Sequence, residues 1–151
     1  MDSTAEQLNK VDDGHFATDI GIVVDSAAKD RVEAHLDIET RHTQPMGIVH
    51  GGVYATIIET LASLGAFLTA WEDGKTSAGV ENHTSFIRSI GAGSRVTAVA
   101  LPIHRGRSMH LWEVDIKDEK DRLVARGTVR LAILDQRDGA EPPAVSQTPA
   151  S

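Results

Sequence analysis

The stretch HGGVYATIIETLASLGAFLTAW, residues 50–71, decides the fold of this chain. Behind two glycines, apolar and small residues fill nearly every position over about the length of a membrane span. The polar exceptions are ordered, because Thr56, Glu59, Thr60 and Ser63 fall at i, i+3, i+4 and i+7 and therefore share one face of a helix. This order favours the buried helix of a soluble protein over a transmembrane segment.

The polar stripe on this helix has two interpretations. It is either the solvent face of an amphipathic helix or the lining of a cleft. A solvent face usually carries several charges, whereas this stripe has one carboxylate, Glu59, among small hydroxyl residues. That composition suits a cavity, in which a carboxylate is poised for proton transfer or attack. Spacing alone leaves both interpretations open.

The turn before the helix is a second candidate for function. His50-Gly51-Gly52 leaves backbone N–H groups unpaired at the helix entry, where the positive helix end suits a carbonyl oxygen that gains negative charge. Alternatively, the glycines only form a tight turn and His50 packs or caps the helix. Glu59 lies about two helical turns beyond Gly51. The two residues can therefore act on one carbonyl carbon only if a substrate group roughly 10 Å long spans the distance or if the turn folds back toward Glu59.

Strand patterns flank the helix on both sides. Residues 31–39 alternate apolar and polar, which predicts a half-buried antiparallel strand. A first strand is indicated between His15 and Asp25, and the last four are expected near Thr76–Arg88, Arg95–His104, Met109–Lys117 and Leu123–Leu134. Residues 1–14 are expected to form a short helix or a loose arm, and residues 135–151 a disordered tail.

Two strands, one long apolar helix and four strands predict an α+β fold. A single antiparallel sheet that curls around the helix satisfies this order, because the helix has nothing else to pack against. Residues 1–134 then form one domain. Because such a sheet covers the helix on one side only, its free edges invite self-association, and a homo-oligomer is expected.

Composition excludes several classes of function. The formal net charge of −7 argues against a nucleic-acid-binding face, so any polyanionic ligand must be held by a few local cations. The absence of cysteine excludes disulfides and thiolate chemistry and is compatible with a cytoplasmic location. No secretory signal is indicated at the N-terminus. No metal site is expected, since the histidines show no HxxxH-like spacing.

Four segments together make the sequence resemble the hotdog-fold thioesterases. They are residues 41–52 (RHTQPMGIVHGG) followed by Glu59 and Ser63, residues 82–88 (NHTSFIR), residues 102–107 (PIHRGR) and residues 118–123 (DEKDRL). The resemblance covers roughly residues 15–134 and indicates the branch with 4-hydroxybenzoyl-CoA thioesterase of the soil-bacterial type. That branch also holds the 1,4-dihydroxy-2-naphthoyl-CoA and enterobactin-proofreading thioesterases. The combination is far more specific than the HGG motif alone.

This resemblance implies a role for each site residue. Glu59 would be the nucleophile or general base, and the Gly51 N–H would polarise the thioester carbonyl. Gln44 and His50 would orient the substrate and the leaving thiolate, and Ser63 would help to place the attacking water. The CoA moiety would meet Arg88 and the turn Gly106-Arg107-Ser108. The family also implies a hotdog sheet around the long helix, dimers that pair into tetramers, active sites shared between two subunits, and no cofactor.

The function we expect is hydrolysis of an acyl-CoA, with an aromatic acyl group. Phe86 departs from the naphthoyl and enterobactin types, which usually have a histidine near this position, so the acyl group stays open. Glu59 either attacks to give a mixed anhydride or activates water, and the sequence does not separate these routes. The alternative is a non-catalytic acyl-CoA-binding or sensing module, which would lack the carboxylate or carry a DNA-binding extension. A hydratase would need a His–Asp pair at the helix start, and none is found there.

Overall fold

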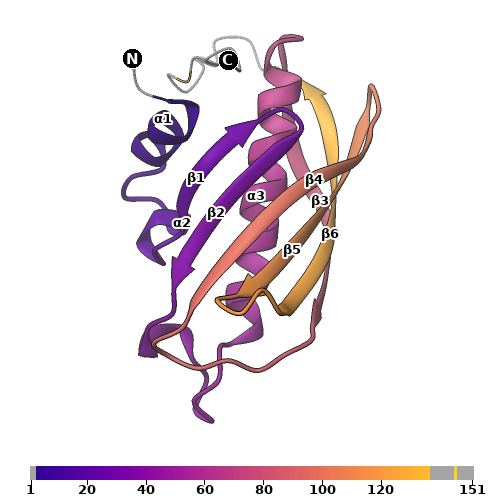
Figure 1. The fold of residues 1–151 in the computed structure, drawn as a ribbon. Helices are drawn as coiled ribbons and strands as arrows, with labels where there is room; N and C mark the ends of the chain where they lie inside the picture. The colour runs from indigo at the N-terminus through magenta and orange to yellow at the C-terminus, as the bar shows by residue number, and fades with distance from the viewer. Residues whose placement is uncertain (1–2, 137–144, 146–151) are drawn as a thin grey trace.

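One antiparallel sheet curls around a long central helix (Figure 1). The computed structural model describes residues 3–136 and residue 145. The elements are α1 (Thr4–Val11), α2 (Phe16–Asp19), β1 (Val23–Ala28), β2 (Arg31–Asp37), the 3₁₀ turn Thr40–His42, α3 (Gly51–Trp71), β3 (Lys75–Phe86), β4 (Arg95–Arg105), β5 (Met109–Asp118) and β6 (Leu123–Asp135). The strand order is β1-β2-β4-β5-β6-β3. The predicted α+β architecture is therefore confirmed.

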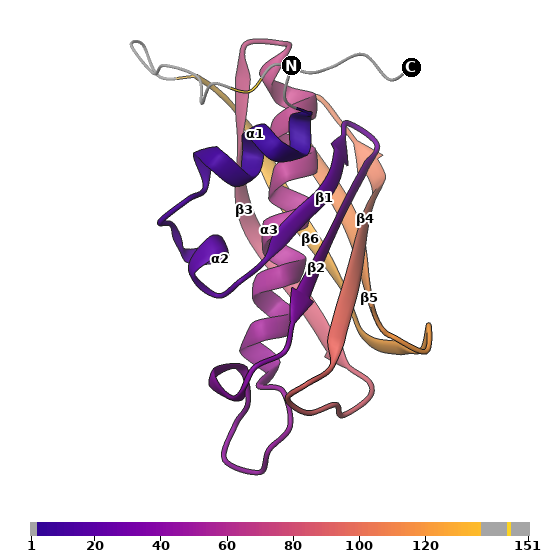
Figure 2. The same cartoon turned by 60° about the vertical axis from the view of Figure 1, so that its left-hand side comes forward.

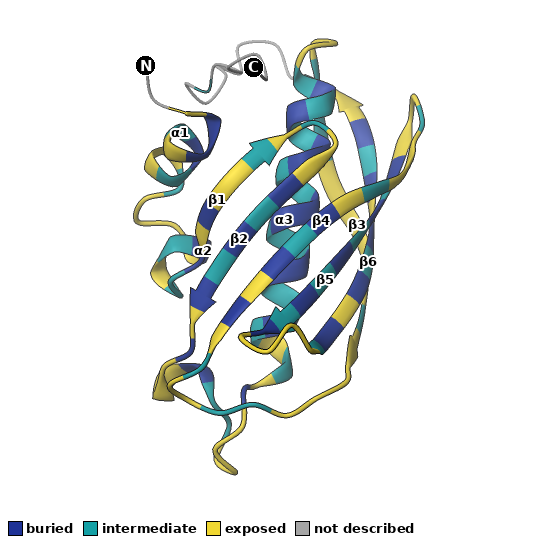
Figure 3. Ribbon diagram, in the orientation of Figure 1, coloured by how far each residue is buried: buried dark blue, intermediate teal, exposed yellow. Residues whose placement is uncertain are grey.

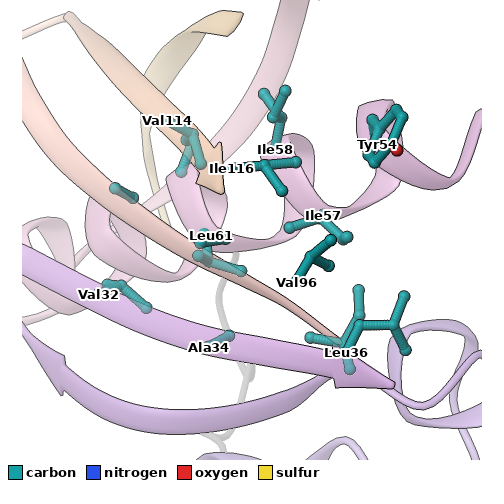
Figure 4. Packing of buried hydrophobic residues seen from close by; sticks show 14 of the residues in the cluster. Val32, Ala34, Leu36, Tyr54, Ile57, Ile58, Leu61, Val96, Val114 and Ile116 are labelled. Carbon is teal, nitrogen blue, oxygen red and sulfur yellow. The ribbon is translucent and has the colours of Figure 1, made fainter. Parts of the chain in front are cut away.

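The core lies between the concave face of the sheet and α3. Alternate residues of the strands point inward, which Figure 3 shows as bands of buried residues that alternate with partly buried ones along β2 and β5. Figure 4 shows side chains of the sheet packed against Ile57, Ile58 and Leu61 of α3. The inward residues are those expected from the alternation, namely Val32, Ala34 and Leu36 in β2 and Trp112, Val114 and Ile116 in β5. Although α3 is long and apolar enough to span a membrane, the sheet wraps around it.

The N-terminal region differs from the prediction. The strand expected between His15 and Asp25 begins only at Val23, and Phe16–Asp19 form the short helix α2. The Thr18 hydroxyl donates to the backbone carbonyls of Asp12 and His15, which closes this turn. The apolar residues that suggested a strand are thus divided between a helical turn and β1. The tail predicted to be disordered begins one residue too early, because Asp135 still belongs to β6. Residues 137–144 and 146–151 of this tail lie outside the described part of the chain.

Helix α1 is attached to the edge of the sheet. A capping box joins Ser3 and Glu6 at its start. The Asn9 side chain donates to the Val24 carbonyl and accepts from the Val24 N–H, both at 2.9 Å. Asn9 thereby satisfies backbone groups on the outer edge of β1 as a neighbouring strand would. The N-terminal arm is consequently a docked helix.

Gly65 sets the distance between α3 and the sheet. Trp112 is fully buried, and the far end of its indole ring lies against Gly65. A Cβ at Gly65 would overlap the ring atoms Cη2, Cζ3 and Cζ2. The helix can approach β5 this closely only because residue 65 has no side chain.

We expect Gly65→Ala to destabilise the protein although alanine is the better helix former. The gain in helix propensity is about 1 kcal/mol, whereas overpacking a core costs roughly 1–3 kcal/mol. Urea unfolding should show a lower midpoint with an unchanged m-value. In the double variant with Trp112→Phe the penalty of Gly65→Ala should shrink, because the overlapping ring atoms are absent. A Gly65→Ala protein more stable than wild type would contradict this packing.

Candidate functional site

Glu59 lies against the edge strand β3. Its Oε2 accepts a hydrogen bond from the Asn82 side chain at 3.2 Å, and its Oε1 accepts one from the Ser63 hydroxyl at 3.4 Å. The Asn82 amide also donates to the Ala55 carbonyl of α3 at 3.2 Å. A Cβ at Gly79 would overlap Glu59 Oε1, so the bare backbone of β3 leaves the space that the carboxylate fills. Two donors and one glycine therefore fix this carboxylate.

The polar stripe follows the strip of α3 that the sheet does not cover. All four of its residues, Thr56, Glu59, Thr60 and Ser63, are partly buried. Figure 2 shows α1 and α2 beside α3, and α3 contacts both α2 and β3. Thr60 and Ser63 line a cavity of about 510 Å³ beneath α1 and α2, whereas Glu59 contacts β3. The stripe is thus the lining of a seam between the two sheet edges, as the cleft interpretation predicts.

His50 caps the start of α3. Its Nδ1 accepts a hydrogen bond from the Gly52 N–H at 2.9 Å, so the capping interpretation of this histidine is correct. Among residues 3–136, the Gly51 N–H has no hydrogen-bond acceptor. The Phe86 ring lies over Gly51, where a Cβ would come within 2.6 Å of its Cζ. The helix entry therefore offers the Gly51 N–H beside an aromatic ring.

Gln44 and Arg88 line a second cavity next to this N–H. It has a volume of about 260 Å³, and Gly51, Tyr54 and Phe86 also contribute to its wall. The Gln44 Oε1 accepts from the Met46 N–H within its own loop. Burial raises the pKa of Tyr54 to about 12, so its phenol is neutral at physiological pH. The structure thus brings the predicted residues Gln44, Gly51 and Arg88 to one cavity, and His50 directly precedes Gly51 in the chain.

Comparison with known proteins decides the family. Residues 46–125, about half of the chain, match the model of the thioesterase superfamily. The chain belongs to this superfamily. A Mycobacterium tuberculosis protein that bears the name of an esterase is 44% identical over 124 residues, which cover 81% of this chain and 88% of that one. The proofreading thioesterase EntH of Cronobacter sakazakii is 37% identical over 131 residues, which cover 87% and 94%.

Solved structures agree with this assignment. A thioesterase from Haemophilus influenzae superposes with a TM-score of 0.84 at 30% identity, covering 93% of this chain and 97% of that one. The predicted hotdog fold is therefore confirmed, and the chain is a thioester hydrolase. The family model and these relatives do not single out the 4-hydroxybenzoyl-CoA branch that the sequence suggested.

The remaining residues that the thioesterase resemblance singled out lie elsewhere in the chain. The turn Gly106-Arg107-Ser108 joins β4 and β5, and it sits at the end of the molecule where α3 finishes (Figure 1). The Gly106 N–H donates to the Met109 carbonyl at 2.8 Å, and the Ser108 carbonyl accepts from the Ile133 N–H at 2.9 Å. Gly51 lies at the opposite end of α3. One thioesterase chain therefore does not gather all the predicted residues.

Glu59 and Gly51 are also separated within one chain. Both belong to α3, and the helical rise from position 51 to position 59 places their backbones about 12 Å apart along the axis. His50 and Gly52 form a regular helix cap, so the turn does not fold back toward Glu59. Of the two geometries considered from the sequence, a folded-back turn is therefore wrong. A carbonyl bound at Gly51 is out of reach of the carboxylate in the same thioesterase chain.

Two residues that hold Glu59, Asn82 and Gly79, were not predicted from the sequence. Asn82 belongs to a segment that carries the family resemblance, but the sequence indicated no role for it. Gly79 had a signal, because an isolated glycine in a strand often marks a bulge or a close backbone approach. Both features occur here, since the pairing of β3 with β6 shifts between Gly79 and Glu81, and Glu59 packs on Gly79.

Proposed function

We propose that this thioesterase hydrolyses acyl-CoA, with an aromatic acyl group, and that Glu59 is its catalytic carboxylate. The observation that carries this proposal is the fixed position of Glu59 in the open seam, between donors from Ser63 and Asn82. A carboxylate can accept about four hydrogen bonds, so two donors leave it able to attack carbon or to bind water. We place the enzyme in the cytoplasm.

Two routes use this carboxylate. In the first, a Glu59 oxygen attacks the thioester carbon, the C–S bond breaks, and water then opens the mixed anhydride to give the acid and to regenerate the carboxylate. In the second, Glu59 takes a proton from a water that Ser63 helps to place, and this water attacks the carbon directly. The C–S bond then breaks, and the proton passes from Glu59 to the leaving thiolate or to solvent, which regenerates the carboxylate. In both routes the negative charge that develops on the carbonyl oxygen is stabilised by the Gly51 N–H and the positive end of α3 that a second copy of the chain supplies.

His50 and Gln44 would act on the leaving group and on the substrate. Because His50 Nδ1 accepts from the Gly52 N–H, a neutral His50 ring carries its proton on Nε2. This N–H can donate to the sulfur as the C–S bond breaks. Gln44 lines the same cavity as Gly51 and would orient the acyl thioester, and Arg88, on that cavity wall, supplies a cation for the CoA phosphates.

The site would be completed by a second copy of the chain. Strand β3 is an edge of the sheet, and in the described residues no strand pairs with its outer side. If β3 pairs antiparallel with its counterpart, the start of one strand meets the end of the other. The entry of α3 in one chain then approaches Glu59 and Ser63 of the partner subunit, with the turn Gly106-Arg107-Ser108 of that subunit nearby to contact CoA. Two such dimers would form the tetramer.

Glu59→Gln should abolish most turnover and leave substrate binding nearly intact. Loss of a general base or nucleophile costs about 10²–10⁴ in rate, so kcat should fall by this factor while KM changes little. Release of free thiol from aromatic and aliphatic acyl-CoAs measures both constants. Glu72→Gln, at the end of the same helix, is the matched control and should behave as wild type. A Glu59→Gln enzyme with near-normal kcat would falsify the assignment, and a wild-type protein inactive on every acyl-CoA would favour a binding module.

Gly79→Ala should impair catalysis without touching a reacting group. Its Cβ would occupy the position of Glu59 Oε1, so the carboxylate must move. Misplacement of a catalytic group by about 1 Å can cost on the order of 10²-fold in rate. We expect kcat to fall by at least tenfold, with circular dichroism and the mass in light scattering unchanged. An unchanged kcat would show that the position of Glu59 set by Gly79 is irrelevant to turnover.

Mixed dimers test whether the site is shared. Glu59→Gln and Gln44→Ala should each be nearly inactive alone. Co-expressed chains that pair at random should recover about a quarter of wild-type activity, since half of the dimers are mixed and each has one intact site of two. If one chain held the complete site, the mixed dimers would remain inactive. Size exclusion with differently tagged chains verifies that mixed dimers are present.

A further inference from the structure

An apolar cavity lies beneath the N-terminal helices. Its volume is about 510 Å³, and α1, α2, β1 and α3 contribute to its wall. Seven large aliphatic or aromatic side chains dominate the lining: Leu8, Val11, Phe16, Ile22, Val24, Leu64 and Phe67. Val11 and Phe16 remain 40% and 68% exposed. Large apolar side chains that stay exposed beside a cavity indicate a ligand that covers them.

The cavity adjoins the catalytic carboxylate of the same chain. Thr60 and Ser63 of the polar stripe form part of its wall. The Ser63 hydroxyl donates to Glu59 Oε1, so a single side chain contacts both the cavity and the carboxylate. A thioester carbon beside Glu59 would therefore have its acyl group within reach of the cavity, on the far side of Ser63.

The cover of the cavity is preformed. Asn9 makes two hydrogen bonds to Val24, which hold α1 on the edge of β1. The Thr18 hydroxyl closes the turn between α1 and α2. A cover held in place before binding costs little ordering entropy when a ligand enters. These helices are thus suited to select a ligand by shape.

The size and charge of the lining restrict the ligand. An apolar cavity of about 150 Å³ accommodates benzene, so this cavity takes a considerably larger group. Asp12 is the one acidic residue of the lining. It interacts with His15, the one basic residue of the lining, so the ionisable side chains of the wall pair with each other, while the aliphatic and aromatic side chains favour hydrocarbon.

We propose that this cavity binds the acyl group of the substrate and selects uncharged, apolar acyl groups larger than a single aromatic ring. The proposal rests on the function proposed above and names the acyl class for the same site. The N-terminal helices then determine specificity, whereas Glu59 and Gly51 carry out the chemistry.

Two variants change the cavity in opposite directions. Val11→Trp adds bulk at its mouth and should narrow it, and Phe16→Ala removes apolar surface from it. Val23→Trp is the matched control, because Val23 lies on β1 outside the cavity and has nearly the same exposure, 41%. All three positions are exposed, so the substitutions leave the core intact.

The experiment compares benzoyl-CoA, 2-naphthoyl-CoA and decanoyl-CoA. Wild type should prefer the two larger substrates over benzoyl-CoA by roughly tenfold or more in kcat/KM. Val11→Trp and Phe16→Ala should each lower kcat/KM for the larger substrates about tenfold and change benzoyl-CoA by less than about twofold, and Val23→Trp should change none. The proposal would be overturned if the wild-type enzyme preferred benzoyl-CoA. It would also be overturned if the two cavity variants changed kcat/KM equally for all three substrates or did not change it at all.

Binding separates failure of this proposal from failure of the proposed function. Calorimetry of the Glu59→Gln protein with 2-naphthoate and decanoate requires no turnover. The three substitutions are each added to the Glu59→Gln protein. If Val11→Trp or Phe16→Ala weakens the binding of these acids and Val23→Trp does not, the result supports the cavity as the acyl site. If wild type hydrolyses none of the three thioesters, the proposed function fails, and the binding measurement still decides on the cavity. If neither cavity variant alters the affinity, the cavity proposal is overturned, whatever the hydrolysis results are.

Discussion

Burial of α3 against the curled sheet is the constraint on which the rest of the structure depends. Fully burying a large aliphatic side chain contributes about 1.5–3 kcal/mol, and α3 buries Ile57, Ile58 and Leu61 almost completely. A six-stranded sheet surrounds most of the helix but leaves a strip between its two edges. Only that strip can hold polar residues without a desolvation cost for the core. The polar stripe, and with it Glu59, lies there as a consequence.

Glycines determine how closely α3 and the strands approach. Gly65 admits the Trp112 ring on the core side of the helix, and Gly79 admits the Glu59 carboxylate on the side of β3. These two contacts set the position of α3 relative to two strands of the sheet, β5 and β3. The packing that stabilises the fold therefore also places the carboxylate. Strand β3 has a double role, because it supplies Asn82 as a donor to Glu59 and presents a free edge.

Periodicity predicted most of the fold, since alternation in β2 and β5 and the apolar run of α3 are direct consequences of burial. The exception is instructive. Phe16 and Ile20 looked like part of a strand, but Phe16 lines a cavity and Ile20 ends a helical turn, so neither occupies a sheet. Local apolar content shows that a segment meets apolar surface, but it does not show whether that surface is a sheet or a cavity. The sequence likewise left open whether His50 caps the helix or orients the substrate, and the hydrogen bond from the Gly52 N–H shows that it does cap the helix.

The sequence indicated which residues lie near one another in the candidate site, but it did not indicate how the two groups around Gly51 and Glu59 are arranged in space. Gln44, Gly51 and Arg88 do share one cavity, and Ser63 does reach Glu59. The separation between Gly51 and Glu59 was already implied by helical rise, but a single sequence contains no direct information on what fills it. The proposed pairing with a second chain would resolve this difficulty and would also cover the exposed edge of β3. On the proposed arrangement, the pairing that protects β3 from unwanted association also brings Glu59 to the helix entry of its partner, so folding, assembly and catalysis depend on the same edge.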